Sequence, residues 1–156
     1  MVSIRRYEAR DAGALADLYR RSVEQIGPRD YGEEQVRAWA ALAPSRVQIE
    51  ARAADGRTTL VAIDDEDQPL AFGDLEHDGH IGYLYCAPEA AGTGVAAALY
   101  DRLEEIARER GMKPLHAEAS EAARRFFLKR GFSVVNRRAF EISGVPIHNY
   151  AVAKRL

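Results

Sequence analysis

The chain has 156 residues, of which 47% are hydrophobic and 29% charged, and its formal net charge is −2. This length favours one domain over residues 1–156, large enough to bury a core without a metal or a disulfide. The small net charge argues against a nucleic-acid partner, and the single cysteine, Cys86, excludes an internal disulfide. Because the sequence has neither a membrane-spanning apolar run nor the apolar core of a secretion signal, we expect a cytoplasmic protein with no membrane partner.

The first half of the chain predicts a strand, several helices and a three-stranded meander. Asp11 is a plausible N-cap for a first helix, and the glycines and proline of residues 26–32 predict a loop. Asp78-Gly79 is a strong signal for a two-residue hairpin turn. The elements expected are a strand over 2–7, a helix after Asp11, helices over 33–42 and from Pro44 to near Gly56, and strands over 58–63, 70–77 and 80–86.

The second half predicts alternating helices and strands. Apolar residues recur on one face of an amphipathic helix over 91–110, which ends at Gly111. The unit of strand 80–86, this helix and strand 114–119 should be a right-handed crossover that places the two strands in parallel. Further elements are a helix from the cap Ser120 to Arg130 and strands over 132–142 and 147–153. The fold class is therefore mixed α/β, in the order β-α-α-β-β-β-α-β-α-β-β around a mixed sheet.

The segment from Cys86 to Ala97 is the most informative motif, because it joins a strand to the start of the amphipathic helix. Gly92 and Gly94 allow close approach to the backbone, and the first N–H groups of the helix have no partner within it. Together with the helix dipole they predict a cradle for a pyrophosphate. The alternative is that the glycines only turn a corner. A dinucleotide motif fits less well, since five residues separate the strand from Gly92.

Two motifs, taken together with the distance between them along the chain, resemble the GNAT superfamily of acetyl-coenzyme A-dependent N-acetyltransferases. The first is the strand over 83–88 with the loop over 91–96, and the second is the Ser120–Phe132 segment with Phe126-Phe127 and Gly131-Phe132. The order of elements is similar from Ile4 to Leu156. The sequence over 31–40 and the Phe126-Phe127 pair are similar to those of a small bacterial branch of this superfamily.

The resemblance implies that acetyl-coenzyme A is the cosubstrate and that no metal takes part. The main-chain N–H groups from Gly92 to Ala97 would hold the pyrophosphate, and the backbone of Leu84 to Cys86 would pair with the pantetheine arm. The thioester would lie where strands 80–86 and 114–119 splay apart. The residues implied in coenzyme binding are Leu84, Tyr85, Cys86, Ala91, Gly92, Thr93, Gly94, Val95, Ala96, Ala97, Ser120, Arg124 and Phe127.

Three positions depart from the family pattern. Ala91 replaces an Arg or Gln, Ser120 replaces an Asn, and Phe127 replaces the Tyr that often protonates the departing thiolate. A thiol pKa is about 8.5, so a thiolate can leave without a dedicated acid. Catalysis is therefore expected to depend on positioning and on polarising the thioester carbonyl.

An attacking amine must be neutral, so a base is needed. Strand alternation places Glu118 and His116 on one face, and Glu118 is the first candidate and His116 the second. Tyr85 is a third catalytic candidate, as a hydrogen-bond donor. The candidates for substrate binding are Tyr31, Trp39, Asp74, Glu76 and Tyr83, and residues 148–150 can also reach the substrate. Each of these residues has the alternative of being an ordinary sheet residue.

Cys86 and the histidines of the hairpin favour structural roles over chemical ones. Cys86 lacks a histidine in a diagnostic local motif, which favours a buried structural thiol. His77 and His80 without a third ligand favour plain turn residues over a metal site. The acids of residues 64–80 suit a cationic amine, and the bases of residues 122–140 suit the coenzyme phosphates.

The sequence thus predicts an N-acetyltransferase that transfers acetyl to a primary amine by direct attack in a ternary complex. The alternative is a non-catalytic sensor domain that binds acyl-coenzyme A. The acceptor stays open among a polyamine, an antibiotic, an amino acid and a protein terminus, and a homodimer is possible.

Overall fold

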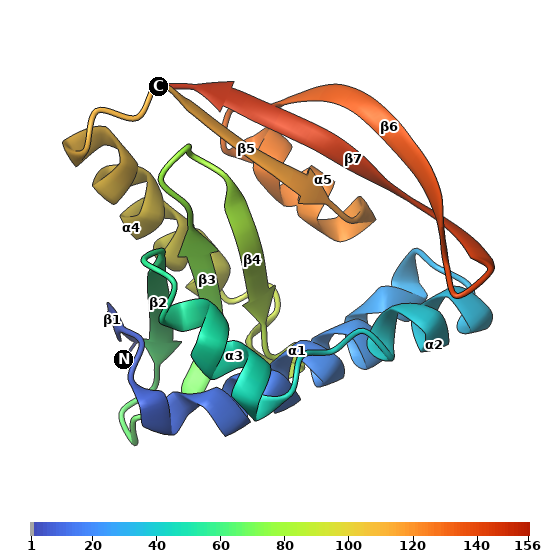
Figure 1. Cartoon of the computed structure of the whole chain (residues 1–156), viewed down its shortest axis with the longest axis horizontal. Coiled ribbons are helices and arrows are strands. Elements are labelled where there is room, and N and C mark those ends of the chain that lie inside the picture. Colours follow the sequence, from blue (N-terminus) through green and yellow to red (C-terminus); the bar gives the residue numbers. More distant parts are fainter. Residues whose placement is uncertain (1) are drawn as a thin grey trace.

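The computed structural model describes residues 2–156, and its strands form two sheets instead of one. The first sheet is antiparallel and contains β1 (Ser3–Arg6), β2 (Thr58–Ile63), β3 (Pro69–Leu75) and β4 (Ile81–Cys86) in that order. The second contains β5 (Pro114–Ala119), β7 (Val145–Arg155) and β6 (Ser133–Ile142), with β7 in the middle. The mixed α/β class with its predicted order of elements is confirmed (Figure 1).

Strands β4 and β5 meet at one point and then diverge. His80 and His116 form a parallel bridge, and the His116 N–H donates to the Gly79 carbonyl at 3.1 Å. Among residues 2–156 no further pairing joins the two strands, so the outer edge of β4 is left free. The predicted parallel crossover with splayed strands is therefore confirmed, and the single mixed sheet is corrected to two sheets joined at this bridge.

Helices cover both faces of the first sheet and one face of the second (Figure 1). Helix α4 (Val95–Glu109) lies on the face where Leu103 packs against Gly73. The adjacent residue, Phe72, faces the opposite side, where its ring contacts Tyr85 beneath helix α1 (Ala12–Ile26). The remaining helices are α2 (Glu33–Ala40), α3 (Arg46–Ala53) and α5 (Glu121–Lys129). None of the helices in residues 2–156 combines the length and apolar character needed to cross a membrane.

Helix starts follow local side-chain chemistry in most places. The Ser120 hydroxyl accepts from the Ala123 N–H at 3.3 Å, which confirms its capping role for α5. Helix α3, predicted to open at Pro44, begins at Arg46 and is capped by Ser45. Asp11 does not cap α1, because its carboxylate instead accepts from the Glu8 N–H and the Arg5 guanidinium. Helix α4 begins at 95 and not at 91, since the glycines at 92 and 94 have positive φ angles of 78° and 89°.

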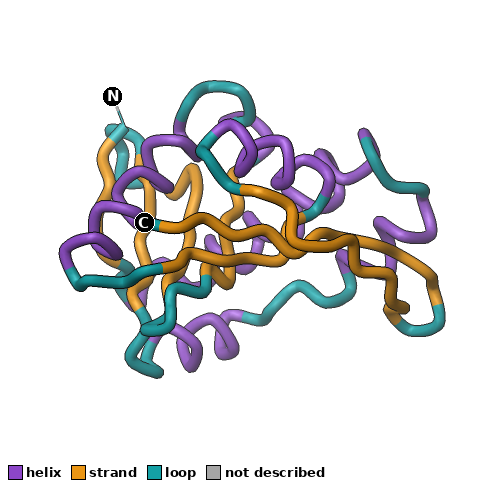
Figure 2. Tube along the Cα trace, turned by 90° about the horizontal axis from the view of Figure 1, so that it is seen from above, coloured by secondary structure: helices purple, strands orange, loops and turns teal. Residues whose placement is uncertain are grey.

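The β6–β7 hairpin is longer than β5, and its far end reaches beyond β5 to helix α2. Figure 2 shows this extension from above. Two hydrogen bonds fasten it there. The Gln35 side chain donates to the Pro146 carbonyl at 3.0 Å, and the Tyr31 hydroxyl donates to the His148 carbonyl at 3.0 Å. The space beside the free edge of β4 is therefore enclosed by the hairpin and by the α1–α2 region.

Candidate active site

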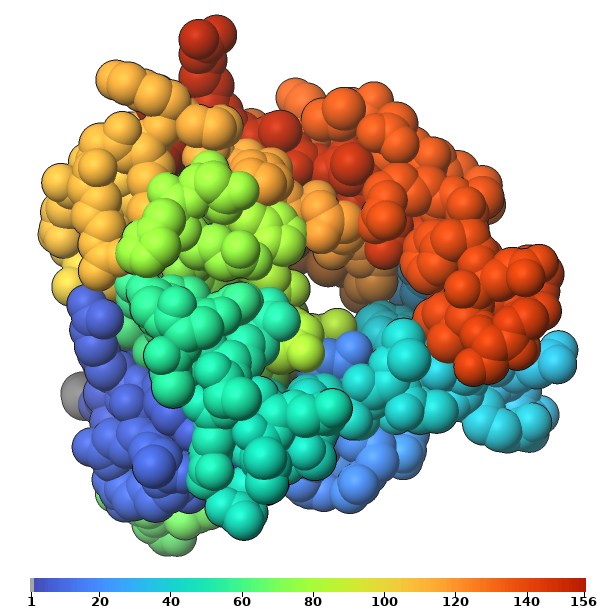
Figure 3. Space-filling model, viewed as in Figure 1, coloured from blue at the N-terminus to red at the C-terminus, as the bar shows by residue number. Residues whose placement is uncertain are grey.

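Two cavities lie at the divergence of β4 and β5. The hairpin cavity, of about 360 Å³, is lined by β4, β5 and residues of the β6–β7 hairpin such as Arg138 and Phe140. The turn cavity, of about 260 Å³, is lined by β4, by α5 and by Ala91 and Gly92 of the glycine turn. Both cavities share Tyr31, Trp39, Leu84, Tyr85, Ser120 and Ala123. Figure 3 shows an opening through the molecule between the yellow-green end of β4, the brown-orange region of α5 and the blue helices of the α1–α2 region.

The glycine turn presents unpaired N–H groups beside the turn cavity. The first hydrogen bond of α4 runs from the Ala98 N–H to the Gly94 carbonyl at 3.0 Å, so the three preceding N–H groups have no partner within the helix. A Cβ atom added at Gly92 or Gly94 would meet nothing within 4 Å. The space in front of this turn is therefore open to an anion. The Thr93 hydroxyl is already bonded to the Ala90 carbonyl.

The free edge of β4 forms the wall that both cavities share. Leu84 and Tyr85 line both of them, and Cys86 lines the turn cavity. Burial raises the pKa of the Cys86 thiol, with a further contribution from Glu89, so the thiol stays protonated and unreactive at neutral pH. Its side chain therefore suits a structural role. Its backbone lies on the free edge of β4, where an extended ligand can pair with it.

Arg29 is a basic residue of the turn cavity that the sequence did not single out, because the glycines and proline around it predicted only a loop. It is exposed, and within residues 2–156 it has no carboxylate at ion-pair distance. It lines the same cavity as Ala91, where the family pattern has an Arg or Gln. Arg124 lines neither cavity, because its guanidinium bonds Glu121 at 3.3 Å.

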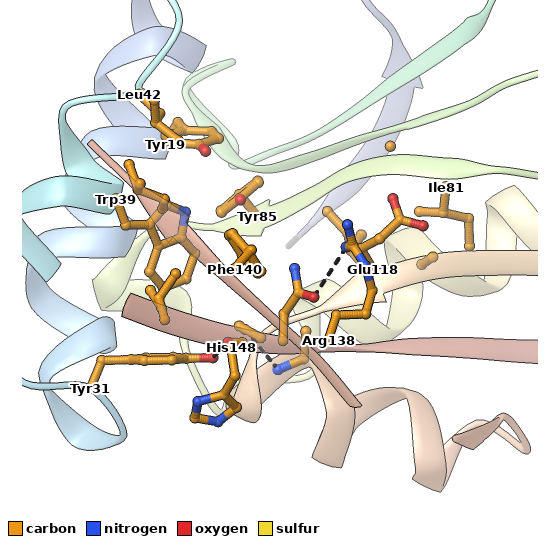
Figure 4. A pocket seen from close by; sticks show the side chains of 18 of the residues that line it. Tyr19, Tyr31, Trp39, Leu42, Ile81, Tyr85, Glu118, Arg138, Phe140 and His148 are labelled. Carbon is orange, nitrogen blue, oxygen red and sulfur yellow. Dashed lines mark hydrogen bonds between the residues drawn. The ribbon is translucent and has the colours of Figure 1, made fainter. Parts of the chain in front are cut away.

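Aromatic rings form the inner wall of the hairpin cavity (Figure 4). The rings of Tyr19 and Tyr85 lie 4.2 Å apart, and Trp39 lies beside them in the same lining. Burial, followed by the proximity of Tyr19, raises the pKa of the Tyr85 hydroxyl well above its usual range. Tyr85 is therefore a neutral hydrogen-bond donor at the junction of the two cavities.

Glu118 is the one acidic residue among those that line the hairpin cavity. Its carboxylate lies 2.8 Å from the His80 Nε2, and the His80 Nδ1 lies 2.7 Å from the Glu76 carboxylate. Burial lowers the pKa of His80, but the bonds to Glu76 and Glu118 outweigh it and raise the pKa above the ordinary value. The three side chains form a chain from the cavity to the surface.

His116 lies outside the lining of the cavity and stacks on His80 with ring centroids 5.0 Å apart. Its Nε2 is 3.7 Å from the Asp78 carboxylate. The ligand atoms of His80, His116 and Glu118 lie within 4.8 Å of one another. The sequence predicted no further ligand beside His77 and His80. The structure places His116 and Glu118 of β5 beside His80. Both ring nitrogens of His80 already bond carboxylates.

Asp74 and Tyr83, two of the residues predicted to bind the substrate, line neither of these two cavities. Asp74 is 1% exposed, and its carboxylate accepts from the Arg52 Nε at 2.7 Å and from the Tyr83 N–H at 2.9 Å. The Arg52 guanidinium also lies 3.8 Å above the Tyr83 ring. Helix α3 therefore covers this part of the sheet with a buried ion pair. Glu76 reaches the cavity only through His80.

The hydroxyl of Tyr31 is occupied by the structure, although its ring lines both cavities. It donates to the His148 carbonyl and accepts from the Glu121 N–H at 3.1 Å. Glu121 in turn accepts from the His148 Nε2 at 2.6 Å and from the Tyr150 hydroxyl at 3.0 Å. These polar groups hold the hairpin against α5. Asn149, on the opposite face of β7, lines the hairpin cavity.

Comparison with known proteins identifies this arrangement. A family model described as an acetyltransferase (GNAT) domain matches residues 28–154. The chain belongs to the GNAT family. It is 29% identical over 150 residues to an uncharacterized N-acetyltransferase of Escherichia coli, YafP. The match covers 96% of this chain and 93% of YafP.

Solved GNAT structures share the fold over nearly the whole chain. A GCN5-related N-acetyltransferase from Rhodopseudomonas palustris is 36% identical, with a TM-score of 0.89 over 99% of this chain and 95% of that one. The PaiA N-acetyltransferase from Thermoplasma acidophilum, solved in complex with coenzyme A, is 18% identical with a TM-score of 0.80. The match covers 100% of this chain and 99% of that one, and at this identity it shows the fold alone.

Phe127 stands where the GNAT pattern often has a tyrosine. Its side chain is 2% exposed, and its ring packs against that of Phe132 with centroids 4.7 Å apart. The ring contributes to the wall of the hairpin cavity but offers no proton. Among the residues that line both cavities, the tyrosines are Tyr31 and Tyr85, and the hydroxyl of Tyr31 is already bonded.

Proposed function

We propose that this GNAT domain transfers the acetyl group of acetyl-coenzyme A to a primary amine by direct attack in a ternary complex. The observation that carries the proposal is the continuity of the two cavities through the β4–β5 divergence. One end of this space offers main-chain N–H groups to an anion, and the other offers the carboxylate of Glu118. Direct attack fits better than a covalent acetyl-enzyme, since the thiol of Cys86 is held protonated.

The turn cavity fits coenzyme A. Acetyl-coenzyme A supplies the acetyl group as an activated thioester. The N–H groups at the start of α4 would hold its pyrophosphate, and the free edge of β4 would pair with its pantetheine arm. Arg29 would supply the basic side chain that Ala91 lacks. The PaiA relative was solved with coenzyme A bound, which supports the same assignment for this fold.

Glu118 would act as the base and take the proton from the amine nitrogen. Its contact with the His80 Nε2 provides an onward path in the neutral form of His80 that carries its proton at Nδ1. In that form Nε2 accepts the proton from Glu118 while Nδ1 releases one to Glu76. His116 is placed to support His80 by stacking, not to touch the substrate. We therefore retain Glu118 as the base in preference to His116.

Tyr85 would donate a hydrogen bond to the thioester carbonyl. Its raised pKa keeps the phenol protonated, and it lies at the junction where the carbonyl would be placed. The Tyr85 hydroxyl bonds Tyr19 and Trp39 in this structure, so it would turn from Tyr19 to the bound thioester. It would then give its proton to the departing thiolate, in place of the acid lost at Phe127. Trp39 and Tyr19 would exclude water from this region.

A sensor that binds acyl-coenzyme A without turnover is the second candidate, and the buried Phe127 favours it. Thermal unfolding with and without coenzyme A, together with thiol release from acetyl-coenzyme A over a panel of amines, separates the two. A transferase gives both a rise in Tm and thiol release. A sensor gives the rise alone, and no rise contradicts both candidates. Arg29→Gln should require several-fold more coenzyme A for the same rise.

A further inference from the structure

The hairpin cavity contains a second charged group, Arg138, that none of the roles above uses. Arg138 on β6 pairs in register with Asn149 on β7, and its Nη1 donates to the Asn149 Oδ1 at 3.1 Å. Its guanidinium also lies 5.6 Å from the centre of the Phe140 ring. All three residues line the cavity, and Figure 4 shows the Arg138 side chain directed into it.

The charge of Arg138 has no negative partner. Within residues 2–156 no carboxylate lies at ion-pair distance from its guanidinium. The one acid that lines the cavity, Glu118, is bonded to His80 instead. A guanidinium has five N–H donors, so the single bond to Asn149 leaves most of them free. Arg138 is exposed and at the same time lines this cavity, so its free N–H groups are open to an anion that enters from solvent.

Asn149 adds a second donor at the same place. Asn149 also lines the cavity, and because its Oδ1 accepts from Arg138, both N–H groups of its Nδ2 are left for another partner. A planar guanidinium beside an amide N–H matches the two oxygens of a carboxylate. The pair is therefore suited to an oxyanion and unsuited to a second amine.

Strand register sets the separation between this pair and Glu118. Glu118 is paired with Ala151 and Arg138 with Asn149, so both side chains leave the same face of the second sheet. They stand two strands and two positions apart, which is about 12 Å between Cα atoms. The cation and the carboxylate therefore stand on one face of one sheet and line one cavity, so a single small molecule can contact both.

We propose that the acceptor is a primary amine that also carries a carboxylate, as an amino acid does. Arg138 and Asn149 bind its carboxylate, and Glu118 faces its amine. The inference rests on the proposed function, since it names the substrate class of the same site. A polyamine is disfavoured, because its second cation would meet Arg138 where it would need an acid.

Paired acceptors test the assignment. Thiol release from acetyl-coenzyme A is measured with the α-amino acids, with the amide of each amino acid, and with spermidine. The free acids should exceed their amides by at least tenfold in kcat/KM. Equal rates for acids and amides, or a preference for spermidine, would overturn the inference and leave the transferase proposal intact. Thiol release from none of these amines would overturn the inference, and thiol release over the wider amine panel would then decide the transferase proposal separately.

Variants of β6 locate the effect. Arg138→Gln should raise the KM for the best amino acid at least tenfold, change that for its amide little, and leave the Kd for coenzyme A unchanged. Arg138→Lys should restore part of the loss. Arg137→Gln is the matched control, because Arg137 is equally exposed but lies on the other face of the strand and does not line the cavity. An equal loss with acid and amide, or the same loss in the control, would show that Arg138 acts on the fold and not on the carboxylate.

Discussion

The turn cavity and the hairpin cavity recognise ligands by different means. The turn cavity offers mainly backbone groups, from the start of α4 and from the edge of β4. The hairpin cavity offers side chains, with Glu118 and Arg138 brought from two strands. Backbone recognition tolerates substitutions such as Ala91, as long as the glycines keep the turn open. Side-chain recognition depends on which residues the sheet places opposite one another.

The largest expected effect is a loss of activity when the Glu118 side chain of the hairpin cavity is changed. Glu118→Gln should lower kcat/KM by about 100- to 10,000-fold, because the amine loses its base, with the affinity for coenzyme A unchanged. Steady-state kinetics together with thermal shifts measure both quantities. Glu105→Gln is the control, since Glu105 is exposed on α4 and pairs only with Arg102 at the surface. Full activity in the Glu118 variant would remove it as the base.

Asp74 tests whether charge near the sheet serves the substrate or the fold. Asp74→Asn should cost about 3 kcal/mol of unfolding free energy, because it leaves the Arg52 guanidinium without its buried partner. The KM for the amine should not change in the folded fraction. Denaturant unfolding and kinetics at low temperature measure these two effects. Asp17→Asn, which breaks surface pairs with Arg20 and Arg21, should cost under about 1 kcal/mol. A raised KM would return Asp74 to the acceptor site.

Two glycines, one at each end of α4, test whether the turn cavity recognises coenzyme A through its backbone. Gly94 and Gly111 both have positive φ, at 89° and 71°, and both have open space around a Cβ position. Alanine at either should cost about 1 kcal/mol of stability. Only Gly94→Ala should also weaken coenzyme A binding, by about tenfold, since only Gly94 adjoins the unpaired N–H groups. Equal coenzyme A affinity in both variants would count against the turn as the pyrophosphate site.

The smallest expected effect concerns His80, which links the cavity to the surface. Because its pKa is raised in the folded state, its contribution to stability is complete below the unfolded value of about 6.5 and is lost as pH rises through the folded value. His80→Gln should therefore lower the Tm more at about pH 5.5 than at about pH 9. Thermal unfolding of both proteins over this range measures the difference. A constant difference would mean that His80 is not held as a cation.

Several features could be predicted from sequence because they depend on near neighbours. The cap at Ser120 and the glycine turn each occupy a few consecutive residues, and the structure has both. The hairpin predicted at 78–79 is present, but its turn has three residues, 77–79, between the bonded Glu76 and His80. Alternation correctly grouped His116 with Glu118 on β5, since a strand places every second side chain on one face. Alternation could not show that α3 would cover Asp74 with Arg52, because that contact joins residues 22 positions apart.

By itself the sequence determined the class of fold, its order of elements and the family, because periodicity, caps and the two motifs are local. Only the tertiary structure decided which charges face the cavities. Glu118 meets His80 across 38 residues, and Arg138 meets Asn149 through the pairing of β6 with β7. Arg29 comes to the turn cavity by the path of the chain between α1 and α2. The physical reason is that strand register and helix packing, which set these meetings, depend on residues far apart in the chain.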